Sequence, residues 1–258
     1  MAPSTKKGDG SMKKILSCIV SAFMLVTAIT ANATAAGTFN DINGHWAEET
    51  IEKWQDAGII SGYPDGTFKP DNPVTRAELA KVLTTAFDLE DTNENKLISN
   101  PYSDVDTNAW YWEYIQYANI YIPVYALPVE NETNAPYVEN AEQDRNGFLP
   151  DINALRIHVA ESLVELKRER ENINIELPDI NTIKESLNKT FKDADYEELF
   201  VNHGTIPQNV RRMFEYTWLA NELGIMQGNS DRYFLPYNNI TRAELVTMID
   251  RVLSDEQN

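Results

Sequence analysis

Two stretches of 22 residues decide the fold: GIISGYPDGTFKPDNPVTRAEL at residues 58–79 and GIMQGNSDRYFLPYNNITRAEL at residues 224–245. Their Gly, Phe, Pro, Thr, Arg, Ala, Glu and Leu positions coincide without a gap. A weaker third copy, FLPDINALRIHV, occupies residues 148–159 and keeps the eight-residue spacing from Phe148 to Arg156. A fixed register over this length indicates an internal repeat, so three copies predict a repeat architecture.

Apolar residues at helical spacing lie before and after each copy, which predicts two helices per repeat. Trp54 and Trp218 are expected in the core on this pattern. Residues 90–100 are polar and predict a linker, and about twenty extra residues up to Gln143 predict a loop within the second repeat. The expected helices lie at about residues 45–57, from residue 75 onward, at about 109–120 and 152–171, around 210–219, and at 241–253.

The starts of two of these helices carry a specific signal. Thr75 with Glu78 three residues later predicts a capping box, and the third repeat has the same pair of residue types at 241 and 244. Arg76 and Arg242 then fall at the first helical position, where free backbone amides are expected to point outward. Gly58 is placed to terminate the preceding helix.

The N-terminal residues predict export. Residues 1–11 are polar and patternless, and we interpret them as a cloning scar or a mis-assigned start. A Lys-Lys pair, a short apolar run and an Ala-rich end make residues 12–35 a predicted secretory signal peptide. A membrane anchor is disfavoured because the run is short and contains Ser and Thr. Cleavage is expected after Ala35, with Ala33 and Ala36 as alternatives.

Charge and cysteine content narrow the possible partners. Without residues 1–35, 18 basic and 39 acidic residues remain, which gives a formal charge of −21. This charge argues against nucleic acid and against an anionic membrane surface as partners. Cys18, the single cysteine, would leave with the signal peptide, so no disulfide framework is expected.

Catalytic and metal chemistry find little support. The three histidines, His45, His158 and His203, have no metal-binding spacing. Residues 91–102 begin like a calcium loop but lack its Gly and its final Glu, so a calcium site is rejected. We therefore predict no catalytic residue, no metal and no cofactor, and a protein that is not an enzyme.

The Phe-x-Asp entry at Phe39, the His45-Trp46-Ala47 triplet, the turn at residues 62–70 and the Thr-Arg-Ala-Glu run at residues 75–78 together resemble the S-layer homology (SLH) module. The resemblance is strong in the first repeat and in the second half of the third, and holds only in outline in the second. It implies a mainly α fold of three helix-loop-helix repeats, a pseudo-threefold helical trimer within one chain. The implied domains are SLH repeat 1 at residues 36–100, a divergent SLH repeat 2 with an inserted loop at 101–190, and SLH repeat 3 at 191–258.

The resemblance also implies a function: non-covalent binding of secondary cell-wall polysaccharide, often pyruvylated, by a secreted protein at the cell wall or S-layer surface. An Arg fork could hold the carboxylate of a pyruvate ketal. The alternative is a surface-layer structural subunit or adaptor that binds another surface protein through the divergent middle repeat. The expected polysaccharide contacts are Arg76, Arg242, Asp41, Trp46, Gly62, Lys69, Asp104, Trp110, Asp193 and Gly228.

Several of these residues have a structural alternative. The Asp side chains could close turns, Trp46 could belong to the core, Lys69 could be a plain surface residue, and either Arg could pair with a neighbouring acid. The second repeat lacks the capping box, because Leu155 and His158 replace Thr and Glu. We therefore predict two competent grooves, at Arg76 and Arg242, and a closed third one in which Asn153 caps the helix early and Arg156 is buried or re-aimed.

Overall fold

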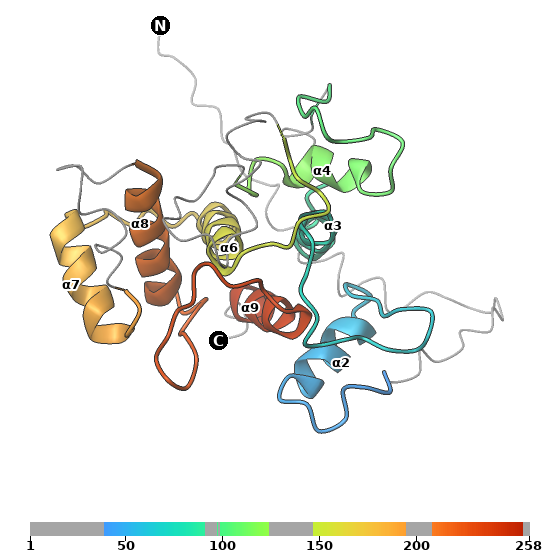
Figure 1. The fold of residues 1–258 in the computed structure, drawn as a ribbon, viewed down its shortest axis with the longest axis horizontal. Helices are drawn as coiled ribbons and strands as arrows, with labels where there is room; N and C mark the ends of the chain where they lie inside the picture. The colour runs from blue at the N-terminus through green and yellow to red at the C-terminus, as the bar shows by residue number, and fades with distance from the viewer. Residues whose placement is uncertain (1–38, 91–96, 98, 124–146, 195–207, 255–258) are drawn as a thin grey trace, which may run out of the picture. The chain divides into compact units, whose positions relative to one another are not determined.

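The computed structural model describes residues 39–90, 97, 99–123, 147–194 and 208–254, all within one compact unit. The predicted scar, signal peptide and cleavage sites, the first half of the rejected calcium loop and most of the inserted loop lie outside these residues. The described part is mainly helical, as predicted (Figure 1). Its helices are α2 (Glu48–Asp56), α3 (Arg76–Phe87), α4 (Trp112–Ala118), α6 (Arg156–Glu171), α7 (Ile180–Thr190), α8 (Gln208–Glu222) and α9 (Arg242–Ser254).

The predicted capping boxes are present at the starts of α3 and α9. The Thr75 hydroxyl accepts a hydrogen bond from the Glu78 amide, and the Glu78 carboxylate accepts one from the Thr75 amide at 2.8 Å. The same pair of bonds joins Thr241 and Glu244. Gly58 follows the end of α2 with φ of 73°, the left-handed conformation expected after a helix.

One predicted helix start was wrong, and one helix was not predicted. The prediction started the long helix of the second repeat near residue 152, but α6 begins at Arg156. Asn153 therefore does not cap it; this residue lies in a bridge with Thr75 instead. The prediction also missed α7, although Asp179 caps its first turn and Ile183 and Leu187 form its buried face.

A closed ring of backbone hydrogen bonds joins the three repeats just before the Arg-led helices. Val74 N–H donates to the Ile240 carbonyl at 3.0 Å, Ile240 N–H to Ala154 at 2.9 Å, and Ala154 N–H to Val74 at 2.8 Å. These three side chains are also buried. The ring is what a three-way arrangement requires, and the pseudo-threefold helical trimer itself stays a prediction.

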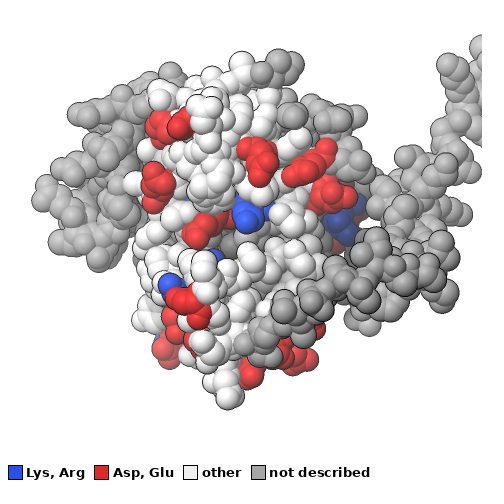
Figure 2. Space-filling model, turned by 90° about the vertical axis from the view of Figure 1, so that its right-hand side faces the viewer, with Lys and Arg blue, Asp and Glu red and all other residues white. Residues whose placement is uncertain are grey.

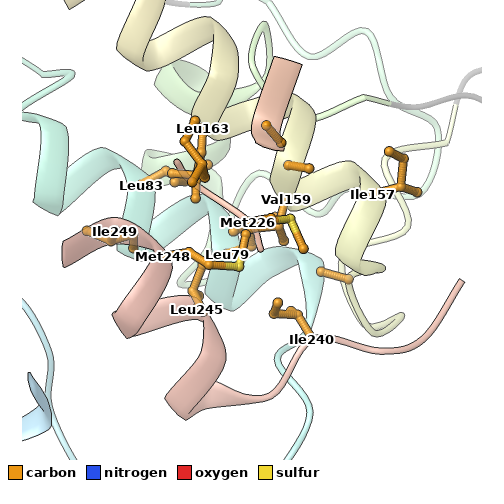
Figure 3. Close-up of a cluster of buried hydrophobic side chains, with 14 of the residues drawn as sticks. Leu79, Leu83, Ile157, Val159, Leu163, Met226, Ile240, Leu245, Met248 and Ile249 are labelled. Atoms are coloured by element: carbon orange, nitrogen blue, oxygen red, sulfur yellow. The ribbon is translucent and has the colours of Figure 1, made fainter. Parts of the chain in front are cut away.

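The helices follow the same cyclic order. The first helix of each repeat packs on the second helix of the preceding one: α4 on α3, α8 on α6, and α2 on α9. Helices α3, α6 and α9 enclose a shared core, with Leu79, Val159 and Leu245 among its members (Figure 3). Trp54 is buried and Trp218 packs partly buried against this core, as predicted for both. The core therefore draws on all three repeats at once.

Each repeat holds its central loop with one carboxylate. Asp41 accepts hydrogen bonds from the Phe68 and Lys69 amides at 2.8 and 2.7 Å. Asp104 and Asp193 hold the matching amides of the second and third repeats at the same distances. Both oxygens of each carboxylate therefore close the loop, which is the structural alternative for these residues, and a contact with a sugar hydroxyl stays a prediction.

Candidate functional site

Each helix-leading Arg reaches out of its own repeat and onto the loop of the next one. Arg76 Nε donates to the Phe148 carbonyl at 2.7 Å, and Arg156 Nε donates to the Phe234 carbonyl at 2.9 Å. Arg242 Nε completes the cycle by donating to the Phe68 carbonyl at 2.7 Å. Any ligand groove at these arginines is consequently shared between repeats, which a repeat-by-repeat interpretation of the sequence could not find.

The first groove is a cavity of about 260 Å³ that is lined by residues of all three repeats. The loop at residues 59–63, which includes Gly62, and one face of α3 form two of its sides. Arg242 enters from the third repeat and Trp110 from the second. Trp110 is 54% exposed, so its ring is available for contact with a ligand.

Gly62 is required by its surroundings. A Cβ atom at this position would lie 2.2 Å from Phe39 Cε1 and 2.5 Å from the Thr67 carbonyl oxygen. Both contacts are far shorter than van der Waals distance, so the loop can approach Phe39 this closely only because residue 62 has no side chain. Gly62 therefore shapes the wall of the first groove through its backbone.

The second groove repeats this plan in the third repeat, with a cavity of about 640 Å³. The loop at residues 226–230, which includes Gly228, and one face of α9 form its sides. Arg156 enters from the second repeat and Trp46 from the first. Trp46 is 63% exposed, which excludes the alternative that it belongs to the core.

The two grooves differ in how their arginines are held. In the second groove an Arg156 terminal nitrogen lies 2.5 Å from Glu244 Oε1. In the first groove the matching Arg242 nitrogen lies 3.9 Å from Glu78 Oε1, beyond hydrogen-bond distance. The Arg242 side chain is 13% exposed and its other terminal nitrogen donates to the Ser61 carbonyl at 3.0 Å. One face of the Arg242 fork therefore remains free of a close carboxylate.

The prediction for Arg76 as a ligand residue was wrong. Arg76 is 1% exposed, because its guanidinium also donates to the Pro123 carbonyl at 2.9 Å and lies 3.4 Å from His158 Nδ1. Burial, and next the charge of Arg76, lower the pKa of His158 well below its usual 6.5, so this imidazole is neutral. The closed junction is thus the one that Arg76 enters, and Arg156 lines the second groove instead.

The expectation of free amides at the helix starts was also wrong. Arg242 N–H donates to the Asn72 carbonyl and Ala243 N–H to the Pro70 carbonyl, both at 2.9 Å. The Thr241 hydroxyl accepts a hydrogen bond from the Glu244 amide. The three Arg-led helices share this pattern of neighbouring carbonyls, so an anion in either groove would be bound by side chains and not by a bare helix end.

Lys69 lies outside the lining of both grooves. Its ammonium lies 4.1 Å from the centre of the Tyr63 ring and 3.6 Å from Asp65 Oδ2. Its backbone has φ of 56°, a left-handed conformation that Leu149 and Leu235 share at the equivalent positions. The position is therefore important for the loop conformation, and a ligand contact by the Lys69 side chain stays a prediction.

Acidic side chains dominate the surface around the few cations. Figure 2 shows Asp and Glu spread over one face of the molecule, with isolated Lys and Arg between them. Among the described residues, no group of three or more His, Cys, Asp or Glu side chains could hold a metal ion. None of the described helices is long and apolar enough to span a bilayer.

The S-layer homology domain family matches residues 38–80 and 219–246 of this chain. These ranges hold the loops of the first and second grooves and the first residues of α3 and α9, whereas the lining residues Lys81 and Thr247 lie just beyond them. They do not include residues 101–190, so a third tandem SLH module in the middle of the chain stays a prediction.

Three relatives illustrate what the chain is similar to. It is 33% identical over 105 residues to the Surface-layer 125 kDa protein of Lysinibacillus sphaericus, 40% of this chain and 8% of that protein. It is 36% identical over 81 residues to the Cellulosome-anchoring protein of Acetivibrio thermocellus, 31% of this chain and 17% of that protein. It is 26% identical over 225 residues to the Amylopullulanase of Thermoanaerobacterium thermosulfurigenes, 86% of this chain and 10% of that protein.

These relatives are all much longer than the matched segment, so the chain spans only a small part of each. Two segments of this chain, one in the first repeat and one in the third, therefore match the S-layer homology domain family, and the chain is similar to proteins of the cell surface.

Proposed function

We propose that this chain attaches to the bacterial cell surface by non-covalent binding of secondary cell-wall polysaccharide in the first and second grooves. The family match and the surface proteins among the relatives support attachment at the cell surface or cell wall. The ligand that suits the grooves is a sugar with an anionic substituent, such as a pyruvate ketal. The proposal assigns the chain an anchoring role and no catalytic one.

The observation that carries this proposal is the pairing of an exposed Trp with an Arg in the lining of each groove. Trp110 and Arg242 line the first groove, and Trp46 and Arg156 line the second. A flat aromatic face offers an apolar surface for a sugar ring, while a guanidinium offers two parallel donors to a carboxylate. The combination suits a ligand that is both a pyranose and an anion.

Overall charge does not oppose this assignment at short range. The mature chain is strongly acidic, but charges farther away than about 8–10 Å are largely screened at physiological salt. The close carboxylate in each groove is the capping Glu, which is already engaged by its own helix start. A ligand carboxylate at the Arg fork would consequently compete with one nearby acid and not with the whole surface.

Binding to purified wall sacculi tests the proposal. Wild-type protein should bind native sacculi and lose binding after the secondary polymer is extracted. The double variant Trp46→Ala/Trp110→Ala should bind at least about fivefold more weakly, since both rings are exposed and central to their grooves. Ile120→Ala is the matched control, because Ile120 is 53% exposed and lies outside both linings.

Unchanged binding to extracted sacculi would instead favour the alternative, an adaptor that binds another surface protein. The closed junction at Arg76 is the observation on which that alternative rests, because it removes one groove from the middle repeat. Equal binding by the Trp double variant and by Ile120→Ala would rule out the two grooves as the glycan sites.

A further inference from the structure

The first and second grooves share their framework but differ in chemistry at several lining positions, two of which matter here. Tyr63 of the first groove corresponds to Asn229 of the second, and Lys81 corresponds to Thr247, both in the ungapped register of the repeats. All four residues line their grooves. The difference at Lys81 is the larger one, because the first groove has an ammonium where the second has a hydroxyl; the second groove has its additional cation, Arg251, one turn further along α9.

Lys81 belongs to the groove face of α3. It lies three residues after Glu78 and one before Val82, so the three side chains share one side of the helix. Its ammonium is 5.7 Å from the centre of the Tyr114 ring, and that ring is 6.3 Å from Trp110. Lys81 therefore lies beside the aromatic wall that Trp110 begins, near the place where a sugar ring would stack.

Lys81 is also an exposed cation without an acid partner. Within the described part of the chain its ammonium forms no ion pair and faces the Tyr114 ring. This is notable in a chain with 40 acidic and 22 basic residues. In the second groove, by contrast, Arg156 is paired with Glu244, and Arg251 donates to the Ile225 carbonyl at 3.1 Å.

We propose that Lys81 is an anion-binding residue that makes the first groove select a glycan with a second negative charge next to the sugar held by Arg242 and Trp110. The inference rests on the proposed function. A Lys ammonium is a compact point charge with three donors on a flexible stem, so it accepts a carboxylate or a phosphate ester equally well. The shared chemistry is a second anionic substituent on the same ring or the next one.

The test compares three probes by titration calorimetry with the full chain in a Trp46→Ala background, which weakens the second groove. One probe is a methyl glycoside with a single pyruvate ketal; the others add either a carboxylate or a phosphate ester to it. With Lys81 present, the doubly charged probes should bind about tenfold more tightly, as expected for one charge-assisted hydrogen bond. Lys81→Gln should remove this preference and leave affinity for the singly charged probe within about twofold.

Lys192→Gln is the matched control. Lys192 is likewise exposed, lies 5.4 Å from the centre of a Tyr ring, Tyr233, and lines neither groove. This variant should keep the preference for the second charge. The inference about Lys81 would be overturned if the preference for the second charge survived Lys81→Gln, or if Lys192→Gln removed it to the same extent. In either case, binding of the singly charged probe would still support the proposed function. If none of the probes binds before Lys81 is changed, both proposals fail together.

Discussion

Arg76 and Arg242 stand in identical Thr-Arg-Ala-Glu-Leu runs, yet one is buried at a closed junction and the other lines a groove. Arg76 is fully buried, whereas Arg242 is only partly buried. Both donate to a Phe carbonyl and to one further carbonyl of the next repeat. The difference lies in the third contact: His158 faces Arg76, and Glu78 faces Arg242.

The comparison teaches that an identical motif acquires its role from the repeat it touches. A neutral imidazole can be buried against a guanidinium, since it adds no second charge to desolvate. A carboxylate at the same place stays partly hydrated, and its groove stays open. The divergent middle repeat thereby changes the environment of an Arg that belongs to the first repeat.

Replacing the two arginines should give the largest effect. Arg76→Met should lower the free energy of unfolding by about 3–5 kcal/mol, because it leaves the buried Phe148 carbonyl and the partly buried Pro123 carbonyl without this donor. Arg242→Met should cost only about 1–2 kcal/mol, since the Ser61 carbonyl lies at an exposed contact where water can replace the lost donor. Urea unfolding monitored by far-UV circular dichroism measures both values.

Equal losses for the two variants would contradict the distinction between a closed and an open junction. Wall binding then separates their functions. Arg76→Met, assayed at a temperature where it is folded, should retain binding to native sacculi, whereas Arg242→Met should lose a substantial part of it.

The closed junction should also be sensitive to acid. The pKa of His158 is lowered well below 6.5, first by burial and then by Arg76. The folded state therefore keeps His158 neutral while the unfolded chain takes up a proton as the pH falls below about 6.5. Stability should drop on acidification by up to about 1.4 kcal/mol per pH unit from this residue alone.

Unfolding free energies of wild type and His158→Gln between pH 7.5 and pH 5 provide the measurement, with those limits chosen to span about one unit or more on each side of the usual His pKa. The remaining histidines are common to both proteins, so their contributions cancel in the difference. The variant should show a flatter pH dependence; parallel curves would mean that His158 is not kept neutral by the junction.

The capping boxes predict an intermediate effect that is equal at the two ends of the chain. Thr75→Ala and Thr241→Ala each remove a hydroxyl oxygen that accepts a hydrogen bond from a backbone amide nitrogen of the helix, 3.2 Å away. Each variant should lose about 0.5–2 kcal/mol of stability by thermal unfolding. A much larger loss at Thr75 alone would show that this cap also maintains the closed junction through Arg76.

The smallest effect distinguishes the first groove from the second. Glu244→Gln should lower stability by about 0.5–1 kcal/mol more than Glu78→Gln, because Glu244 pairs with Arg156 at 2.5 Å while Glu78 lies 3.9 Å from Arg242. Gln retains the capping geometry in both cases, so the difference reports the ion pair. Identical melting of the two variants would indicate that the two arginines are held equally.

The sequence by itself determined the repeat register, the two capping boxes, the glycine after α2 and the core positions of Trp54 and Trp218. Each of these follows from local spacing, because a helix cap or a buried stripe depends on residues within one or two turns. It also indicated the family and five of the residues that line the grooves: Trp46, Trp110, Gly62, Gly228 and Arg242. Local pattern was sufficient wherever the contacts were local.

The tertiary structure alone decided which residues share a groove. Arg76 meets Phe148 across 72 positions in sequence and Arg242 meets Phe68 across 174, so spacing within one repeat could not reveal either contact. Asp41 likewise binds the amide of a loop residue 27 positions away, a structural role that spacing within the sequence did not reveal. Long-range packing sets the burial and the partners of a charged side chain, and those two quantities separate a binding residue from a structural one.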